Sequence, residues 1–447
     1  MSGKINGALV MDVCDERAVF ETHESAVRSY CRGFPAVFAR AQGATLIDGS
    51  GRRFIDFLAG AGTLNYGHNH PAIKQRVIDY LAADGIVHSL DLHTVAKQRF
   101  IEEMVGTILE PRGLDYRLAF TGPTGANAVE LALKFARRAT QRHNVVAFTN
   151  AYHGMSQGAL AVSGTRSKRA GAGIPLAGVS RLPYDGYLGD VDTADLLEKM
   201  LDDAGSGLDM PAAIILETVQ GEGGLNTASP SWLRRIRQIA TRHGIVLIID
   251  DIQAGCGRTG TFFSFENMNV TPDIVCLSKA IGGMGMPLSI VLVRPELDVL
   301  TPGQHNGTFR GNNLAFVAGT AALEMWRKPS FEWGIQKLAA RLRMKLDELV
   351  ARYPGHGAHV RGRGFLTGIG WTDPSIAGRV SKEAYARGLV IETSGPEGQV
   401  LKMMPPLTIT AQEFDTGFAI IDEAIGVVAA AMPDQLRIVP ELAAANA

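Results

Sequence analysis

The chain has 447 residues, of which 46% are hydrophobic and 20% charged, and its formal net charge is −1. This balance lacks the basic excess of proteins that bind nucleic acids or anionic membranes. No apolar stretch approaches the roughly 20 residues of a membrane span, and no secretory signal is evident. The four cysteines show no C-x-x-C spacing. We therefore expect a cytoplasmic protein of more than one domain, with neither a metal site nor a disulfide framework.

Residues 1–65 are expected to form an N-terminal segment that packs with the C-terminal part of the chain. Its clearest element is ATLIDGSGRRFIDFL, which predicts a β-hairpin with its turn at Asp48 to Gly51.

The middle of the chain alternates short apolar runs with helical patterns. The runs are RLAFT (117–121), VVAFT (145–149), AAIILE (212–217), IVLIID (245–250), IVCLS (274–278) and SIVLV (289–293). Their nearly continuous apolar character predicts strands buried on both faces of a mainly parallel sheet. Apolar residues recur with helical spacing between the first two runs and between the third and fourth. The pattern predicts an α/β fold whose large, doubly wound domain spans residues 66–328.

The last third of the chain has a different pattern. Ile335, Leu338, Leu342, Leu346, Leu349 and Tyr353 form one apolar stripe of a long helix. Shorter strand-like pieces such as FLTGIGW and GLVIET follow it. We expect a smaller α+β domain over residues 329–447, with the boundary at the turn of Arg327, Lys328 and Pro329.

Two turns are candidates for binding a phosphate. Thr124 and Gly125 precede a helix expected to begin near Ala126, so free N–H groups and the helix dipole converge on an anion-sized position. A Thr-Gly turn before a helix is also an ordinary N-cap. The second turn, HNGTFRGNN, offers Thr308.

Polar residues also follow the strands at 145–149 and 212–217. Tyr152 is placed to lie over an aromatic ligand, although a core tyrosine is the alternative, and we assign His153 no catalytic role. Glu217 and Glu222 offer carboxylates at the same sheet edge, either as gates of a substrate pocket or as solvated charges.

The runs IVLIIDDIQAGCGRTG and IVCLSKAIGG end at charged residues and continue into glycine-rich chain. Successive side chains of a strand point to opposite faces, so Asp250 is expected to face a ligand and Asp251 to be structural. Lys279 would be partly desolvated, which lowers the pKa of an amine and makes it a nucleophile. An acid and an amine at one edge of a sheet are what a pyridoxal phosphate enzyme requires. A solvated lysine and a surface pair of aspartates are the alternatives.

The chain resembles the class III (ornithine/GABA-type) aminotransferases, which belong to the fold type I pyridoxal phosphate enzymes. The most specific match is DDIQAGCGRTGTFFSFE with SKAIGG downstream, and the resemblance extends from GHNHP (67–71) to MMPPLTIT. It implies a homodimer with shared active sites, bound pyridoxal 5'-phosphate, and a large sheet domain with a smaller α+β domain. The residue roles that it implies are these: Lys279 as the Schiff-base lysine, Asp250 on the pyridine nitrogen, Ile252 and Tyr152 against the ring, Gln253 at the phenolic oxygen, Thr124, Gly125 and Ala126 at the phosphate, and Thr308 at the phosphate from the second subunit.

Three departures from the common family pattern narrow this resemblance. Met155 stands where an arginine often follows YHG, Lys402 stands where an arginine often precedes the Pro-Pro turn, and the phosphate turn is GPTGANA. These features, with SGTRSKRAGAGIPL, are similar to the L-2,4-diaminobutyrate:2-oxoglutarate aminotransferases of ectoine, siderophore and antibiotic pathways.

The resemblance implies a ping-pong exchange between L-2,4-diaminobutyrate and 2-oxoglutarate. Lys402 and either Arg28 or Arg32 are the candidates for binding substrate carboxylates, with Glu222 as a possible gate. Three alternatives are open: an aminotransferase acting on ornithine, GABA or a diamine, an aminomutase, and a pyridoxal-binding regulator. The last is disfavoured because no spare segment is long or basic enough to bind DNA.

Overall fold

The computed structural model describes residues 17–432. The outer parts of the expected terminal segments, residues 1–16 and 433–447, lie outside the described residues. Within 17–432 no helix is long and apolar enough to cross a membrane. Nor does this part of the chain contain a group of three or more His, Cys, Asp or Glu side chains that could hold a metal ion.

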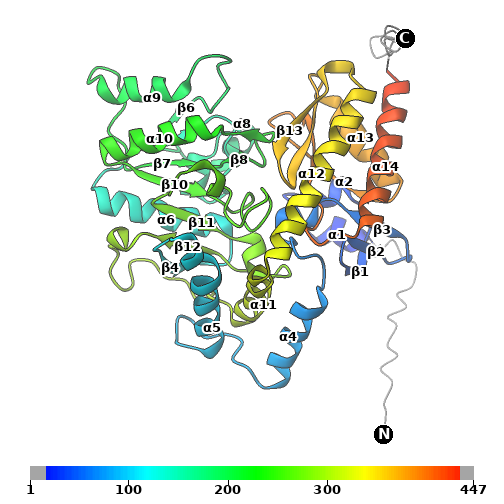
Figure 1. The fold of residues 1–447 in the computed structure, drawn as a ribbon, viewed down its shortest axis with the longest axis horizontal. Coiled ribbons are helices and arrows are strands. Elements are labelled where there is room, and N and C mark those ends of the chain that lie inside the picture. Colours follow the sequence, from blue (N-terminus) through cyan, green and yellow to red (C-terminus); the bar gives the residue numbers. More distant parts are fainter. Residues whose placement is uncertain (1–16, 433–447) are drawn as a thin grey trace.

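A seven-stranded sheet is the centre of the larger lobe (Figure 1). Its order is β4-β12-β11-β10-β7-β5-β6, and β12 runs antiparallel to both of its neighbours while the other pairings are parallel. The strands are β4 (Arg117–Phe120), β5 (Val145–Phe148), β6 (Val179–Leu182), β7 (Ala213–Leu216), β10 (Val246–Asp250), β11 (Ile274–Leu277) and β12 (Ile290–Val293). The mainly parallel sheet is as expected, whereas the edge strand β6 was not predicted.

Alternate residues of the central strands enter two separate hydrophobic cores. On β10, Leu247 and Ile249 pack into one core, and Val246 and Ile248 pack into the other. Helix α10 (Pro230–His243) contributes Trp232 and its apolar neighbours to the first core, and α6 (Gly125–Thr140) covers the opposite face. The unbroken apolar runs in the sequence are explained by this burial on both sides.

The C-terminal lobe contains an antiparallel sheet of order β13-β14-β17-β16 and three helices (Figure 1). Its strands are β13 (His359–Arg363), β14 (Leu366–Gly370), β16 (Glu392–Ser394) and β17 (Val400–Met403), and its helices are α12 (Pro329–Arg352), α13 (Ser375–Ala386) and α14 (Ala411–Ala430). The buried positions of α12 include Ile335, Leu342, Leu346 and Leu349, which all belong to the predicted stripe.

The N-terminal segment shares a sheet with this C-terminal lobe. Strands β1 (Phe38–Gln42), β2 (Thr45–Asp48) and β3 (Arg53–Asp56) form an antiparallel meander, and the hairpin of β2 and β3 turns at the expected place. Strand β15 (Leu389–Val390) then pairs in parallel with β3.

The remaining elements connect these sheets. They are α1 (Ala18–His23), α2 (Tyr30–Gly33), α3 (Ala59–Gly62), α4 (Pro71–Ala82), α5 (Val95–Glu103), α7 (Gln157–Val162), α8 (Arg166–Arg169), α9 (Thr193–Asp202), α11 (Asn313–Leu323), β8 (Val219–Gln220) and β9 (Asn226–Thr227).

Candidate active site

A cavity of about 770 Å³ lies at the carboxyl ends of the parallel strands. Asp250 is the last residue of β10, Lys279 follows β11, and both line the cavity together with the first turn of α6. Glu392 on β16 and Tyr30 on α2 complete the wall from the C-terminal lobe and the N-terminal segment. Ligands of open α/β sheets bind at this edge.

Lys279 is held in a strained backbone conformation. Its φ is 54°, in the left-handed region that non-glycine residues rarely adopt. The Nζ atom donates a hydrogen bond of 2.8 Å to the carbonyl of Ala61, in the loop after β3 that contains the single distorted turn α3. Burial lowers the pKa of Lys279, although Glu222 opposes this effect. The site therefore contains an amine that is aimed into the cavity and partly desolvated.

The two neighbouring aspartates at the end of β10 have different environments. Asp250 lines the cavity, and its Oδ2 lies 2.7 Å from Nδ1 of the fully buried His153. Burial alone would lower the pKa of His153, but the hydrogen bond to Asp250 outweighs it and the pKa is raised. Asp251 points elsewhere and accepts a hydrogen bond of 3.0 Å from the Ser264 N–H. The two side chains thus point in different directions, as expected for successive residues of a strand.

The first turn of α6 faces the same cavity. Thr124 is the N-cap residue, and its N–H donates to Oδ1 of Asn127 at 3.3 Å. The N–H groups at the first helical positions have no carbonyl partner within a helix. At Gly125, a Cβ atom would lie 2.9 Å from Cδ1 of Ile252, so glycine allows Ile252 to pack closely against the turn. Free N–H groups at a helix start are suited to binding an anion, and Thr124, Gly125 and Ala126 line the cavity at this start.

Gln253 brings an unpaired polar atom to the cavity wall. Its Nε2 donates to the carbonyl of Ala61 at 2.9 Å and to Oε1 of Glu222 at 3.3 Å, but its buried Oε1 has no hydrogen-bond partner. A polar group that is buried without a hydrogen-bond partner is costly. It indicates that a polar ligand completes the site.

Tyr152 is positioned by Glu217. Its N–H donates to Oε2 of Glu217 at 3.0 Å, and the Gly221 N–H donates to the other carboxylate oxygen at 3.2 Å. Burial raises the pKa of Glu217 to about 7. The ammonium group of Lys168 lies 4.1 Å from the centre of the Tyr152 ring, which is a favourable cation–π distance.

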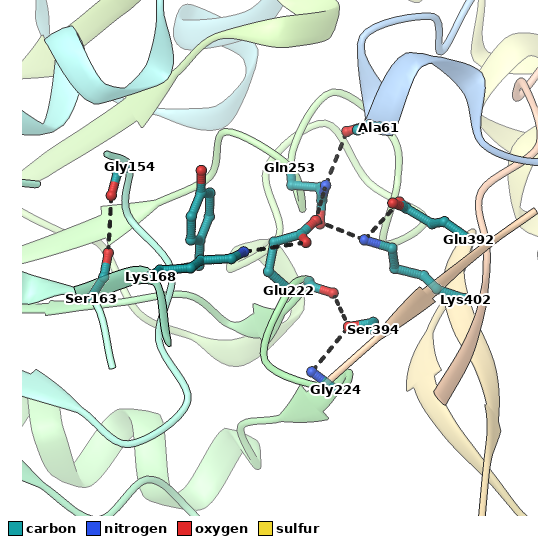
Figure 2. Close-up of polar contacts among 12 residues, drawn as sticks. Ala61, Gly154, Ser163, Lys168, Glu222, Gly224, Gln253, Glu392, Ser394 and Lys402 are labelled. Carbon is teal, nitrogen blue, oxygen red and sulfur yellow. Dashed lines mark hydrogen bonds and ion pairs between the residues drawn. The ribbon is translucent and has the colours of Figure 1, made fainter. Parts of the chain in front are cut away.

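A row of opposite charges extends from Lys168 to Glu392 (Figure 2). The Nζ atom of Lys168 lies 3.9 Å from Oε2 of Glu222, whose Oε1 lies 2.8 Å from Nζ of Lys402. Lys402 is also 2.9 Å from Oε1 of Glu392. Although burial would raise the pKa of Glu222, Lys402 outweighs it and lowers the pKa to about 2. Lys402 itself is fully buried behind the cavity wall.

Three predicted residues lie away from this cavity in the described chain. Arg28 and Arg32 line a separate cavity of about 570 Å³, where Arg28 pairs with Glu24 at 3.2 Å and Arg32 donates to the carbonyl of Ala26 at 3.0 Å. The short helix α2 presents Tyr30 to the site instead. Thr308 lies on an exposed loop, with its carbonyl 2.9 Å from Nε2 of His88.

Sequence reasoning missed several residues of the site. His153 had a signal, because it follows Tyr152 directly. Glu392 had one too, since it is a carboxylate inside the otherwise apolar run GLVIET. No local pattern pointed to Lys168 or to the carbonyl of Ala61, because their positions depend on how distant loops fold together.

The family model for class III aminotransferases matches residues 28–425. The chain therefore belongs to the class III aminotransferases, which depend on pyridoxal phosphate. It is 54% identical over 408 residues to a diaminobutyrate–2-oxoglutarate transaminase of Halalkalibacterium halodurans, covering 91% of this chain and 96% of the relative. It is 53% identical over 416 residues to the enzyme of that name from Nocardia farcinica, with 92% and 95% covered.

A solved structure of similar fold is the ornithine aminotransferase of Toxoplasma gondii ME49. The two share 27% sequence identity with a TM-score of 0.80, over 93% of this chain and 95% of that one. The large sheet domain and the cofactor expected from the sequence are thereby confirmed.

The residues on the cavity wall fit this cofactor. The amine of Lys279, the carboxylate of Asp250 and the first turn of α6 supply partners for an aldehyde, a pyridine nitrogen and a phosphate. The amide of Gln253, with its unpaired Oε1, lies on the same wall. When bound, pyridoxal phosphate supplies an electron sink for a carbanion at the substrate carbon.

Proposed function

We propose that the enzyme exchanges the 4-amino group of L-2,4-diaminobutyrate with 2-oxoglutarate, giving L-aspartate 4-semialdehyde and L-glutamate. The observation that carries this proposal is the 54% identity to a diaminobutyrate–2-oxoglutarate transaminase over 91% of the chain. The cavity supports this proposal, because its wall contains both Lys279, for the terminal amine, and charged residues of the row from Lys168 to Glu392. Those charges suit the α-ammonium and α-carboxylate groups of an amino acid.

Each residue of the site has a part in the proposed reaction. Lys279 holds the cofactor at rest and then moves a proton at the substrate carbon, which requires an amine that can be neutral. Asp250, oriented by His153, keeps the pyridine nitrogen protonated. Thr124, Gly125 and Ala126 would hold the phosphate. Tyr152 and Ile252 would contact the ring, and Gln253 would hydrogen-bond the phenolic oxygen of the ring.

Glu222 is proposed as a gate between the two half reactions. While its Oε1 contacts Lys402, the charge of that lysine is neutralised and is not offered to a substrate carboxylate. A turn of Glu222 away from Lys402 would open the cation to one carboxylate of 2-oxoglutarate. Such a switch lets one site take a terminal amine in one half reaction and an α-amine in the other.

The proposal includes a homodimer in which Thr308 binds the phosphate of the partner's site. Thr308 is exposed and does not line the cavity of its own chain. Its neighbour Phe309 is 68% exposed, and Leu92 and Val95 on the nearby segment are 65% and 63% exposed. The segments are close, since His88 contacts both Thr308 and Phe309. Large apolar side chains exposed together are typical of an interface, and we assign this one to a second copy of the chain.

We also propose that the enzyme is cytoplasmic and that it serves the synthesis of ectoine, a siderophore or an antibiotic. Cell fractionation tests the location, and the genes beside this one test the pathway.

A panel of amine donors tests the reaction. We expect L-2,4-diaminobutyrate to give the highest kcat/KM with 2-oxoglutarate, ahead of ornithine, GABA and diamines. Lys279→Ala is the negative control. It should lose turnover and the visible absorbance of the bound cofactor while keeping the circular dichroism spectrum of the wild type.

A preference for ornithine or GABA would favour another class III activity. Amine transfer without any added keto acid would instead favour an aminomutase.

A further inference from the structure

The proposed substrate has a zwitterionic end that the site must recognise. When the 4-amino group of L-2,4-diaminobutyrate reacts, the α-ammonium and α-carboxylate groups lie two carbons away from the reacting carbon. GABA has only the carboxylate there, and 1,3-diaminopropane has only the ammonium. A site selective for diaminobutyrate needs one accessible cation and one accessible anion next to each other.

The accessible cation is Lys168. The only lysines or arginines that line the cavity, among residues 17–432, are Lys168 and Lys279, and Lys279 is committed to the cofactor. Lys168 lies over the Tyr152 ring at 4.1 Å, so its ammonium group is beside the side chain proposed to contact the cofactor ring. Its other contact is the ion pair to Glu222 at 3.9 Å, which is long enough to exchange for a substrate carboxylate. Lys402, Arg28 and Arg32 do not line this cavity.

The accessible anion is Glu392. Four carboxylates line the cavity within the described chain: Glu217, Glu222, Asp250 and Glu392. Glu217 accepts two backbone N–H groups, Asp250 is bound to His153, and Glu222 lies between two lysines. Glu392 has one ion pair, between its Oε1 and Nζ of Lys402 at 2.9 Å. Of the four carboxylates on the wall it has the fewest partners within the described chain, which leaves its second oxygen for a ligand donor.

The charges of the row also suit a zwitterion. Lys168, Glu222, Lys402 and Glu392 alternate in sign and sum to zero, as Figure 2 shows for their order. A neutral ligand end with one charge of each sign leaves that balance intact, whereas a lone carboxylate or ammonium group adds an uncompensated charge in a largely buried place.

We propose that Lys168 binds the α-carboxylate and Glu392 the α-ammonium group of L-2,4-diaminobutyrate, and that the two residues determine the enzyme's selectivity for this amine. The proposal rests on the proposed function and adds the residues that set its substrate.

The experiment compares three amines with the holoenzyme: L-2,4-diaminobutyrate, 4-aminobutyrate and 1,3-diaminopropane. Each has the same reacting amine and differs in the groups at the far end. Stopped-flow absorbance of the bound cofactor gives an apparent dissociation constant and a half-reaction rate for each amine. Arg166→Met, on the same helix as Lys168, and Glu397→Gln, an exposed glutamate near Glu392, are the matched controls.

Lys168→Met should weaken diaminobutyrate and 4-aminobutyrate by roughly 10- to 100-fold and leave 1,3-diaminopropane within about 2-fold. Glu392→Gln should weaken diaminobutyrate and 1,3-diaminopropane by a similar factor and spare 4-aminobutyrate. Glu392→Asp, which keeps the charge, should retain part of the selectivity and guards against a general loss of structure.

Equal losses on all three amines, or no loss on any, would overturn the assignment while leaving the proposed function standing. If the wild-type enzyme does not use diaminobutyrate at all, the proposed function fails. In that case the opposite responses of the two simpler amines still decide whether Lys168 and Glu392 bind a carboxylate and an ammonium group.

Discussion

Asp250 and Asp251 are adjacent in sequence, yet their carboxylates leave the end of β10 on opposite sides and meet different partners. Strand geometry predicted this division from the sequence. The partner of Asp250 was not predictable in the same way, since His153 lies on a different loop and reaches Asp250 only through the parallel arrangement of β5, β7 and β10.

Asp250→Asn tests the role of this carboxylate. An amide cannot keep the pyridine nitrogen charged, so we expect kcat to fall by roughly 10²-fold or more, with a much smaller change in the amount of bound cofactor. Steady-state rates and cofactor absorbance measured on the same preparation check this. Asp347→Asn removes an exposed carboxylate of α12 and serves as the control. An unchanged rate in Asp250→Asn would contradict the role.

The residues proposed to bind the substrate are harder to find from the sequence than those proposed to bind the cofactor. Lys279, Asp250 and the turn before α6 occupy strand ends and a helix start, which apolar runs mark in the sequence. Arg28 and Arg32 were chosen for their charge alone, and they contact other residues of the N-terminal segment. Two charged residues of the cavity wall that the sequence did not point to, Lys168 and Glu392, come from a four-residue helix and a three-residue strand.

Asp251 holds the glycine-rich loop that follows β10 in place through two hydrogen bonds. Its carbonyl accepts the Gly255 N–H at 3.0 Å, and its carboxylate accepts the Ser264 N–H at 3.0 Å. Burial raises the pKa of Asp251 to about 7 from the ordinary value of 3.8. Between these pH values the folded protein keeps a proton that the unfolded chain has released. The contribution of Asp251 to stability therefore falls as pH rises from about 4 to about 7.

Asp251→Asn should remove this dependence. We expect the stability difference between wild type and variant to change across that range by up to about 4 kcal/mol, at about 1.4 kcal/mol per pKa unit. Chemical denaturation at several pH values measures it, with Asp84→Asn as an exposed control. Parallel curves for wild type and Asp251→Asn would contradict the expectation.

The strands that the sequence revealed are those with apolar side chains on both faces. The sequence of strand β6, VSRL, gives no apolar run because two adjacent polar residues stand in its middle. It lies at the edge of the sheet, where three of its four positions are only half-buried. The short strands β15 and β16, of two and three residues, carry no period long enough to show their pairing. Pairing of β15 with the N-terminal strand β3 depends on tertiary packing.

The proposed sharing of the site between two subunits can be tested with mixed dimers. Lys279→Ala homodimers should be inactive, and Thr308→Val homodimers should be weakly active. When Thr308 serves the partner's site, a mixed dimer contains one site with both native residues, so mixing should restore up to about half of the activity per mixed dimer. The two variants are refolded together, and the activity of the mixed dimers and the amount of cofactor that they retain are then measured.

Mixing restores nothing if Thr308 acts within its own chain, because every site then carries one substitution. The two homodimers measured alone are the controls.

The carbonyl of Ala61 connects the site to the first part of the chain, since it accepts hydrogen bonds from both Lys279 and Gln253. Its loop follows β3, and β3 is paired with β15 at residues 389–390. During synthesis, the ribosome must therefore release almost the entire chain before the loop has its final support. The large sheet can form earlier, because all its strands precede residue 294. We therefore expect nascent chains to be inactive until roughly the last tenth of translation, even when their central sheet has already folded.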